Sequence, residues 1–81
     1  MLSTDVKRVE DFSGLVLIGA DFRGAQLEGA DFSMCSLEGA DFTGANLKGA
    51  DFTDSDVYTA SFEGANLEGA DFTGVFEPPT K

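Results

Sequence analysis

The stretch ADFTGANLKGADFTD, residues 40–54, decides the fold because three kinds of residue return at every fifth position. Alanine occupies positions 40, 45 and 50, a large apolar residue occupies 42, 47 and 52, and glycine occupies 44 and 49. In an α-helix, five residues leave about 140° between successive members of such a series. In a flat strand, successive members alternate faces because five is odd. The apolar residues can therefore share one interior only if the chain turns once in every five residues, always in the same sense.

The same pattern extends from this stretch in both directions. Two residues after most of the large apolar positions stands glycine, which suits the third residue of a type II turn because that residue needs φ > 0. Met34, Asp54 and Thr59 replace glycine at three of these corners. We predict an inward core of thirteen large side chains, with alanine filling the corners: Phe12, Leu17, Phe22, Leu27, Phe32, Leu37, Phe42, Leu47, Phe52, Val57, Phe62, Leu67 and Phe72.

The number of sides in one coil follows from slower periodicities. Phenylalanine alternates with leucine or valine along the core series, so the order repeats every ten residues or a multiple of ten. Two outward series then recur every twenty residues: the amides Gln26, Asn46 and Asn66, and the hydroxyls Ser13, Ser33, Thr53 and Thr73. Twenty residues at five per side predict a four-sided coil, with about three coils in the chain. Residues twenty apart should then lie about 4.8 Å apart, the spacing of neighbouring strands.

The repeated pattern Ala-Asp/Asn-Leu/Phe-x-Gly, found from residue 10 to residue 76, resembles the pentapeptide-repeat family. The resemblance implies an all-β fold, a right-handed quadrilateral β-helix or solenoid, and its handedness comes from the resemblance alone. We expect three segments: an N-terminal cap at 1–9, the β-helix at 10–76 and a C-terminal tail at 77–81.

Both ends of a solenoid need a cover, because an end coil exposes apolar side chains and unpaired backbone. At the N-terminal end we expect the contacts to come from Leu2, Val6 and Val9. At the other end Glu77 takes a large apolar position, and the two prolines after it donate no N–H to a ladder. Two alternatives remain there: Val75 and Phe76 fold over the last coil, or a second copy stacks end to end as a homodimer through the C-terminal coil.

Composition restricts the classes of partner and of chemistry. The chain has 15 acidic and 5 basic residues, for a net charge of −10, which argues against direct binding to nucleic acid or to an anionic membrane. It has no histidine and one cysteine, so it has neither an internal disulfide nor a His/Cys zinc site. We expect no cofactor, no metal and no catalytic residue. The N-terminus has no signal-peptide pattern and no segment is apolar enough to span a membrane, which favours a cytoplasmic protein.

Aspartate precedes most of the phenylalanines and supplies the candidate partner-contact residues. On a four-sided coil, four of these side chains stack in one column on a single wall. A basic protein surface could bind such a column, or the short side chains could instead bond the local backbone at the corners. Both interpretations apply to the same six residues: Asp11, Asp21, Asp31, Asp41, Asp51 and Asp71.

These observations favour a non-catalytic structural or protein-interaction module with an acidic surface and an unidentified protein partner. The resemblance offers an alternative, since some members of the family imitate DNA and bind DNA gyrase. The charge density is compatible with it: residues 10–76 hold 13 acidic and 2 basic residues, a net charge of −11. This span measures roughly 16 Å at strand spacing, over which B-DNA carries about nine charges. However, the gyrase-binding rods are much longer and pair through a C-terminal helix, which no part of this sequence predicts.

Overall fold

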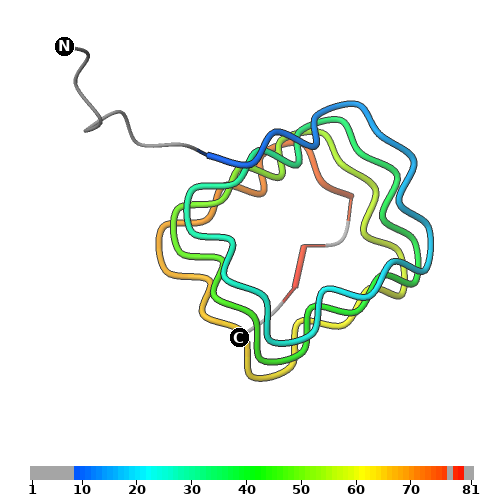
Figure 1. Cartoon of the computed structure of the whole chain (residues 1–81). Coiled ribbons are helices and arrows are strands. Elements are labelled where there is room, and N and C mark those ends of the chain that lie inside the picture. Colours follow the sequence, from blue (N-terminus) through cyan, green and yellow to red (C-terminus); the bar gives the residue numbers. More distant parts are fainter. Residues whose placement is uncertain (1–8, 77, 80–81) are drawn as a thin grey trace, which may run out of the picture.

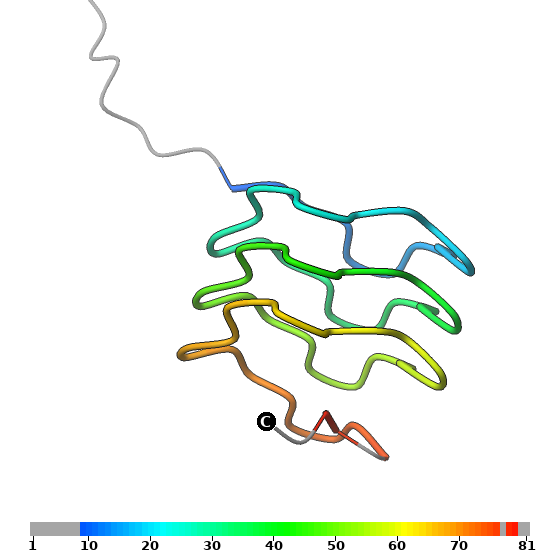
Figure 2. The same ribbon diagram turned by 90° about the horizontal axis from the view of Figure 1, so that it is seen from below.

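A computed structural model describes residues 9–76 and 78–79, in which the chain forms a four-sided β-helix of successive twenty-residue coils (Figure 1). With its N-terminal end nearest the viewer in Figure 1, the chain runs clockwise as it recedes, so the coil is right-handed. Figure 2 shows the successive turns stacked along one axis. The described residues contain no helix and no strand longer than a single bridge residue. The predicted right-handed quadrilateral β-helix is confirmed.

Every β-bridge is parallel and joins residues twenty apart, which confirms the twenty-residue coil. The longest column runs from Asp11 through Asp31 and Asp51 to Asp71 and so spans three coils. The coil has four walls. Wall 1 contains residues 10–14, 30–34, 50–54 and 70–74; wall 2 contains 15–19, 35–39 and 55–59; wall 3 contains 20–24, 40–44 and 60–64; wall 4 contains 25–29, 45–49 and 65–69.

Residues 40–44 show how one five-residue side satisfies its backbone. The N–H of Ala40 closes the preceding corner at 3.0 Å, and the N–H of Asp41 bonds the previous coil at 2.9 Å. The N–H groups of Phe42 and Gly44 bond the next coil at 2.8 and 2.9 Å. The fifth donor, the N–H of Thr43, bonds the Oδ1 atom of Asp41 at 2.9 Å. All five backbone N–H groups of this side are therefore paired, as the backbone of a folded protein requires.

The corners need a left-handed residue, and glycine supplies it at most of them. Gly44, for example, has φ 70°, and the N–H of the next residue bonds the carbonyl of Phe42 at 2.9 Å, as in a type II turn. Three side-chain-bearing residues adopt the same region: Met34 at φ 56°, Asp54 at 58° and Thr59 at 59°. Because a side chain is strained in this region, these corners are less favourable than the glycine corners.

We expect Met34→Gly to stabilise the protein by about 1 kcal/mol, because it removes the left-handed strain from an exposed corner. Chemical denaturation of the two proteins measures the difference. Gly44→Ala is the matched change in the opposite direction and should destabilise, since it places a Cβ at φ 70°. A destabilised Met34→Gly protein would show that the methionine side chain makes a contact worth more than the strain.

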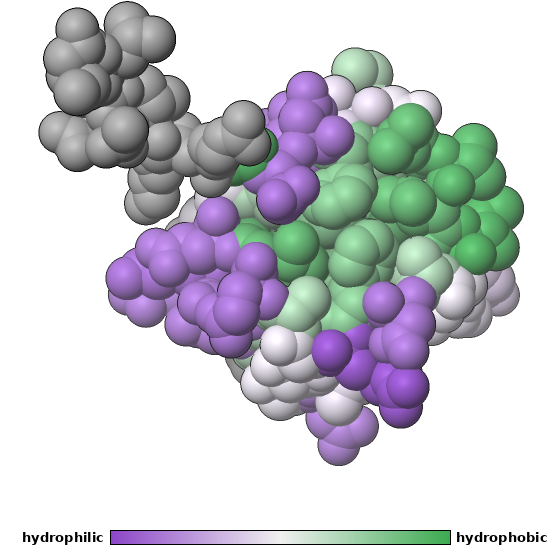
Figure 3. Space-filling view, viewed as in Figure 1, coloured by the Kyte–Doolittle hydropathy of each residue, from purple (hydrophilic) through white to green (hydrophobic). Residues whose placement is uncertain are grey.

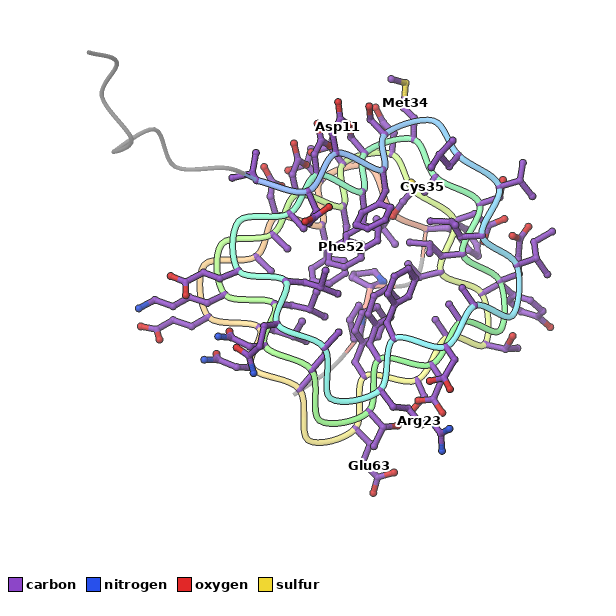
Figure 4. All side chains as sticks on the ribbon, viewed as in Figure 1. Asp11, Arg23, Met34, Cys35, Phe52 and Glu63 are labelled. Atoms are coloured by element: carbon purple, nitrogen blue, oxygen red, sulfur yellow. The ribbon has the colours of Figure 1, made fainter. Side chains whose placement is uncertain are left out.

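The interior is filled by two phenylalanine columns that interlock. Within each column, rings twenty residues apart stack with centroids 4.8–5.1 Å apart. Rings of walls 1 and 3 also meet edge to face, as Phe42 meets Phe32 at 5.3 Å and Phe52 at 5.7 Å. Figure 4 shows Phe52 in this interior. The buried members of the predicted core are Leu27, Phe32, Leu37, Phe42, Leu47, Phe52, Val57 and Phe62, and the partly buried members are Phe12, Leu17, Phe22, Leu67 and Phe72.

The two ends differ from the middle coils. At the N-terminal end, residues 1–8 of the expected cap lie outside the described residues, and Val9 is exposed. At the C-terminal end, Figures 1 and 2 show the chain crossing beneath the last coil after wall 1. Val75 packs against the core there, whereas Phe76 is 94% exposed. The expectation that both residues cover the last coil is therefore wrong for Phe76.

Candidate functional site

The six candidate aspartates form two columns on opposite walls and do not converge on one point. Asp11, Asp31, Asp51 and Asp71 stack on wall 1, and Asp21 and Asp41 stack on wall 3. Figure 4 shows Asp11 pointing away from the interior. The columns therefore present carboxylates on two separate faces, an arrangement suited to a broad charged surface rather than to a pocket.

Each of these carboxylates first serves the turn that follows it. Asp51 Oδ1 accepts hydrogen bonds from the backbone N–H of Thr53 at 2.8 Å and from its hydroxyl at 2.5 Å. Asp31 bonds Ser33 in the same way, at 2.9 and 2.7 Å. This is the local backbone bonding that the sequence left as an alternative. It also explains why a serine or threonine recurs two residues after each aspartate of wall 1.

Hydrogen bonding lowers the pKa of the exposed carboxylates on both walls. The pKa of Asp11, Asp41 and Asp71 is lowered chiefly by the hydroxyl of the serine or threonine two residues on, and then by its backbone N–H. On wall 3, the side-chain hydrogen bonds of Arg23 lower the pKa of Asp21 to about 2. The guanidinium forms an ion pair with this carboxylate, with Nη2 lying 2.9 Å from Oδ2.

We expect acid to destabilise the coil in a defined window. A carboxylate whose pKa is lower in the folded state stabilises that state above its unfolded pKa, and this contribution is lost as pH falls through the folded value. The window therefore runs from the ordinary value of 3.8 down to about 2 for Asp21. Thermal melts between pH 7 and pH 2 measure the loss.

The Arg23→Gln variant is the control for this acid loss. Removing the guanidinium should raise the pKa of Asp21 toward its ordinary value, because the Arg23 side chain is the largest cause of the lowering. NMR titration of the Asp21 carboxyl carbon measures that pKa directly. A melting temperature that stays constant or rises from pH 4 to pH 2 would contradict the expected acid loss.

Asp51→Ala should destabilise the protein by about 1–2 kcal/mol, the cost of losing a side-chain cap on a backbone N–H. Asp51→Asn should cost far less, because an amide oxygen can accept the same bond from Thr53. Asn66 already accepts the equivalent bond on wall 4, where its Oδ1 lies 3.0 Å from the N–H of Glu68. Urea denaturation of both variants measures the difference, and equal losses would show that charge, rather than the cap, matters at position 51.

Wall 2 departs from this pattern. At Val16 and Ser36 no side chain caps the N–H two residues on within the described part of the chain, whereas Asp56 caps the N–H of Tyr58 at 3.0 Å. The outward residues Val16, Ile18 and Tyr58 are 71, 63 and 68% exposed. Figure 3 shows apolar residues on the right side and across the centre of the N-terminal end, whereas the hydrophilic residues gather on the other sides. Sequence reasoning missed this wall, although its signal was present: valine and isoleucine occupy outward positions that are polar on the other walls.

A cavity of about 470 Å³ lies at the C-terminal end of wall 2 and is lined by residues 55–60 and 74–76. The single cysteine lies elsewhere on wall 2, where Cys35 is buried, its Sγ donates to the carbonyl of Phe12 at 2.9 Å, and burial raises its pKa (Figure 4). Within residues 9–76 and 78–79, no cluster of acidic, cysteine or histidine side chains could hold a metal ion. The same residues include no helix capable of crossing a bilayer.

Comparison with known proteins places this geometry among repeat proteins. A family model described as pentapeptide repeats matches in eight copies, over residues 11–33, 20–57 and 35–74. No curated protein matches the sequence.

Two solved structures are similar to the chain. The crystal structure of a pentapeptide repeat protein from the Arabidopsis thaliana thylakoid lumen is 43% identical, with a TM-score of 0.77, over 78% of this chain and 43% of that one. A pentapeptide repeat protein from the cyanobacterium Cyanothece 51142 is 34% identical, with a TM-score of 0.52, over 80% of this chain and 37% of that one. The chain spans less than half the length of either protein.

Proposed function

This chain belongs to the pentapeptide-repeat family, and from that premise we propose that it is a non-catalytic protein-interaction module whose acidic walls contact a basic surface of a partner protein. The observation that carries this proposal is the carboxylate column of wall 1. Each carboxylate commits Oδ1 to its own turn, and no hydrogen bond within the described residues uses Oδ2 of Asp11, Asp31, Asp51 or Asp71. One oxygen of each carboxylate therefore remains available to a partner.

The coil holds these oxygens in place. The neighbouring coils are tied by backbone hydrogen bonds of 2.7–3.0 Å on every wall, and the interior behind wall 1 is closed by stacked phenylalanine rings. A rigid array loses little conformational freedom on binding, which favours association. Charge complementarity would mainly increase the association rate and select a basic partner, and both effects weaken with salt.

The test uses asparagine, which can keep the turn cap while removing the charge. In affinity capture from native lysate, the wild-type chain should retain a basic protein at low salt and release it at high salt. The wall 1 variant D31N/D51N, which removes two charges from neighbouring coils as its control does, should lose this protein. The wall 3 variant D21N/D41N is the matched control for a general effect of net charge. Retention that is equal for all three chains would refute a role for the wall 1 column.

A gyrase supercoiling assay distinguishes a basic partner in general from a DNA-binding enzyme. We expect no inhibition, because at ~3.4 Å per base pair along each strand the coil matches only about five base pairs of B-DNA. Inhibition by the wild-type chain at low micromolar concentration, absent in the wall 1 variant, would instead assign the carboxylate column to DNA mimicry.

A further inference from the structure

The irregular features of the coil meet at wall 2. Its two bounding corners hold all three left-handed residues other than glycine within the described chain: Met34 and Asp54 before the wall, and Thr59 after it. A threonine at positive φ is strained because its side chain is β-branched. The cavity lined by residues 55–60 and 74–76 lies at the C-terminal end of the same wall.

The ladder above this cavity shows which atoms a neighbouring segment would pair with. On the middle coil, the N–H groups of Leu37 and Gly39 donate to carbonyls of the coil below at 2.7 and 2.9 Å. In return, the N–H of Asp56 donates to the carbonyl of Cys35 at 2.9 Å. Each side of the lower coil therefore accepts two hydrogen bonds from the side above it and donates one hydrogen bond to that side.

On the last coil the same three backbone groups belong to residues that line the cavity. Within the described residues, the N–H groups of Val57 and Thr59 have no acceptor, and the carbonyl of Ser55 has no donor. The chain keeps its regular corner as far as Val75, whose N–H bonds the carbonyl of Phe72 at 3.1 Å, and departs from the ladder at Phe76. The place beneath residues 56–59 is therefore an open edge with a known hydrogen-bonding register.

The chain's own tail is poorly suited to this edge. A regular continuation after Val75 would place Glu77 at the inward position beneath Val57, and burying an unpaired carboxylate is costly. The residue that fits this position is aliphatic, because Val57 lies above it and Val75 beside it. On the outside, Asp54 and Asp56 favour a neutral or basic residue, and the exposed rings of Tyr58 and Phe76 offer apolar contact.

We propose that this edge binds an extended peptide segment of a partner protein, running parallel to residues 55–59, with an aliphatic residue inward and neutral or basic residues outward. This proposal rests on the proposed function, because it names the edge at which a protein-interaction module of this kind would bind a peptide segment of its partner. The two carbonyls of the segment accept from Val57 and Thr59, and one of its N–H groups donates to Ser55. This is strand addition at an open edge, with main-chain bonds for affinity and one inward pocket for specificity.

The experiment titrates the ¹⁵N-labelled full chain with the blocked heptapeptide Gly-Ala-Asn-Leu-Lys-Gly-Ala, which has the sequence of residues 44–50. Binding should shift the amide signals of Val57 and Thr59 and slow their hydrogen exchange, while amides of the first coil remain unchanged. The control peptide carries Glu in place of Leu and should bind at least about tenfold more weakly. No shift at Val57 and Thr59 at millimolar peptide, or equal binding of both peptides, would overturn the proposal.

A second variant tests the edge without relying on a weak peptide. E77L/P79G restores an inward aliphatic residue and a corner glycine, so the tail should occupy the edge itself. We expect Val57 and Thr59 to be protected in this variant without peptide, and its peptide affinity to fall at least about tenfold. Concentration-dependent protection of the same amides in the wild type alone would mean that a second copy is the occupant, which also overturns the proposal. If the peptide fails while lysate capture still depends on the wall 1 column, the edge proposal fails alone.

Discussion

Phe42→Ala should destabilise the protein by about 3–5 kcal/mol, the range for removing a fully buried phenylalanine ring. Phe42 is completely buried, and its ring stacks on Phe22 at 5.0 Å and on Phe62 at 5.1 Å. It also meets the edges of the two neighbouring rings of wall 1. Because neither column can close the gap without leaving its ladder, the cavity should persist. Small domains have about 5–15 kcal/mol of stability, so this one change could remove most of it.

Phe72→Ala is the matched control for this prediction. Phe72 belongs to the last coil and is only partly buried, with stacking on one side against Phe52 at 4.8 Å. Its loss should therefore cost clearly less than that of Phe42. Glu63→Ala, at an exposed outward position, should change stability by less than about 0.5 kcal/mol. Urea denaturation followed by circular dichroism measures all three, and equal costs at positions 42 and 72 would contradict a core that is closed in the middle and open at its end.

The fold could be predicted from the sequence because the inward positions repeat without interruption. A five-residue period is incompatible with a helix or a flat strand, and the amide and hydroxyl columns then select twenty residues per coil. The bridges from Gln26 to Asn46 and from Asn46 to Asn66 confirm that choice. Spacing alone could not show that the phenylalanines of opposite walls touch, because contact depends on the width of the interior. The backbone geometry of each five-residue side sets that width. The sequence indicates this geometry only through its resemblance to the pentapeptide-repeat family.

The candidate site was less accessible to sequence reasoning. The aspartate positions could be listed, and bonding to the local backbone was one of two interpretations. The recurring Asp-x-Ser/Thr pairs were the signal for it, and Asp51 with Thr53 shows the bond that they form. The open edge beneath Val57 could not be predicted, because it depends on where the chain leaves the ladder. Glu77 marks the end of the pattern, but only the structure shows that Val75 still turns the corner and Phe76 does not.

Ala50→Leu should be the second most damaging change, because the corners of the coil have no room for a larger side chain. Ala50 is completely buried at the corner where wall 4 meets wall 1, and its neighbours along the corner, twenty residues away on either side, are also alanines. Its backbone is fixed by an N–H bond to Leu47 at 2.9 Å and a carbonyl bond from Asp71 at 2.9 Å. The added methylenes must therefore displace the neighbouring rings or break the ladder, at a cost of about 1–3 kcal/mol or more.

Ala20→Leu makes the same change on the first coil and separates crowding from any intrinsic effect of leucine. Ala20 is half-buried, so its corner has solvent on one side and the longer side chain can turn outward. We expect the cost at position 20 to be well below the cost at position 50 in paired urea denaturations. If Ala50→Leu were neutral, the corners would contain unfilled space, and the small residues there would be explained by the bend of the backbone alone. A large loss at position 50 together with a small loss at position 20 would instead show that the interlocked rings fill the middle coils out to their corners and leave the walls no room to move.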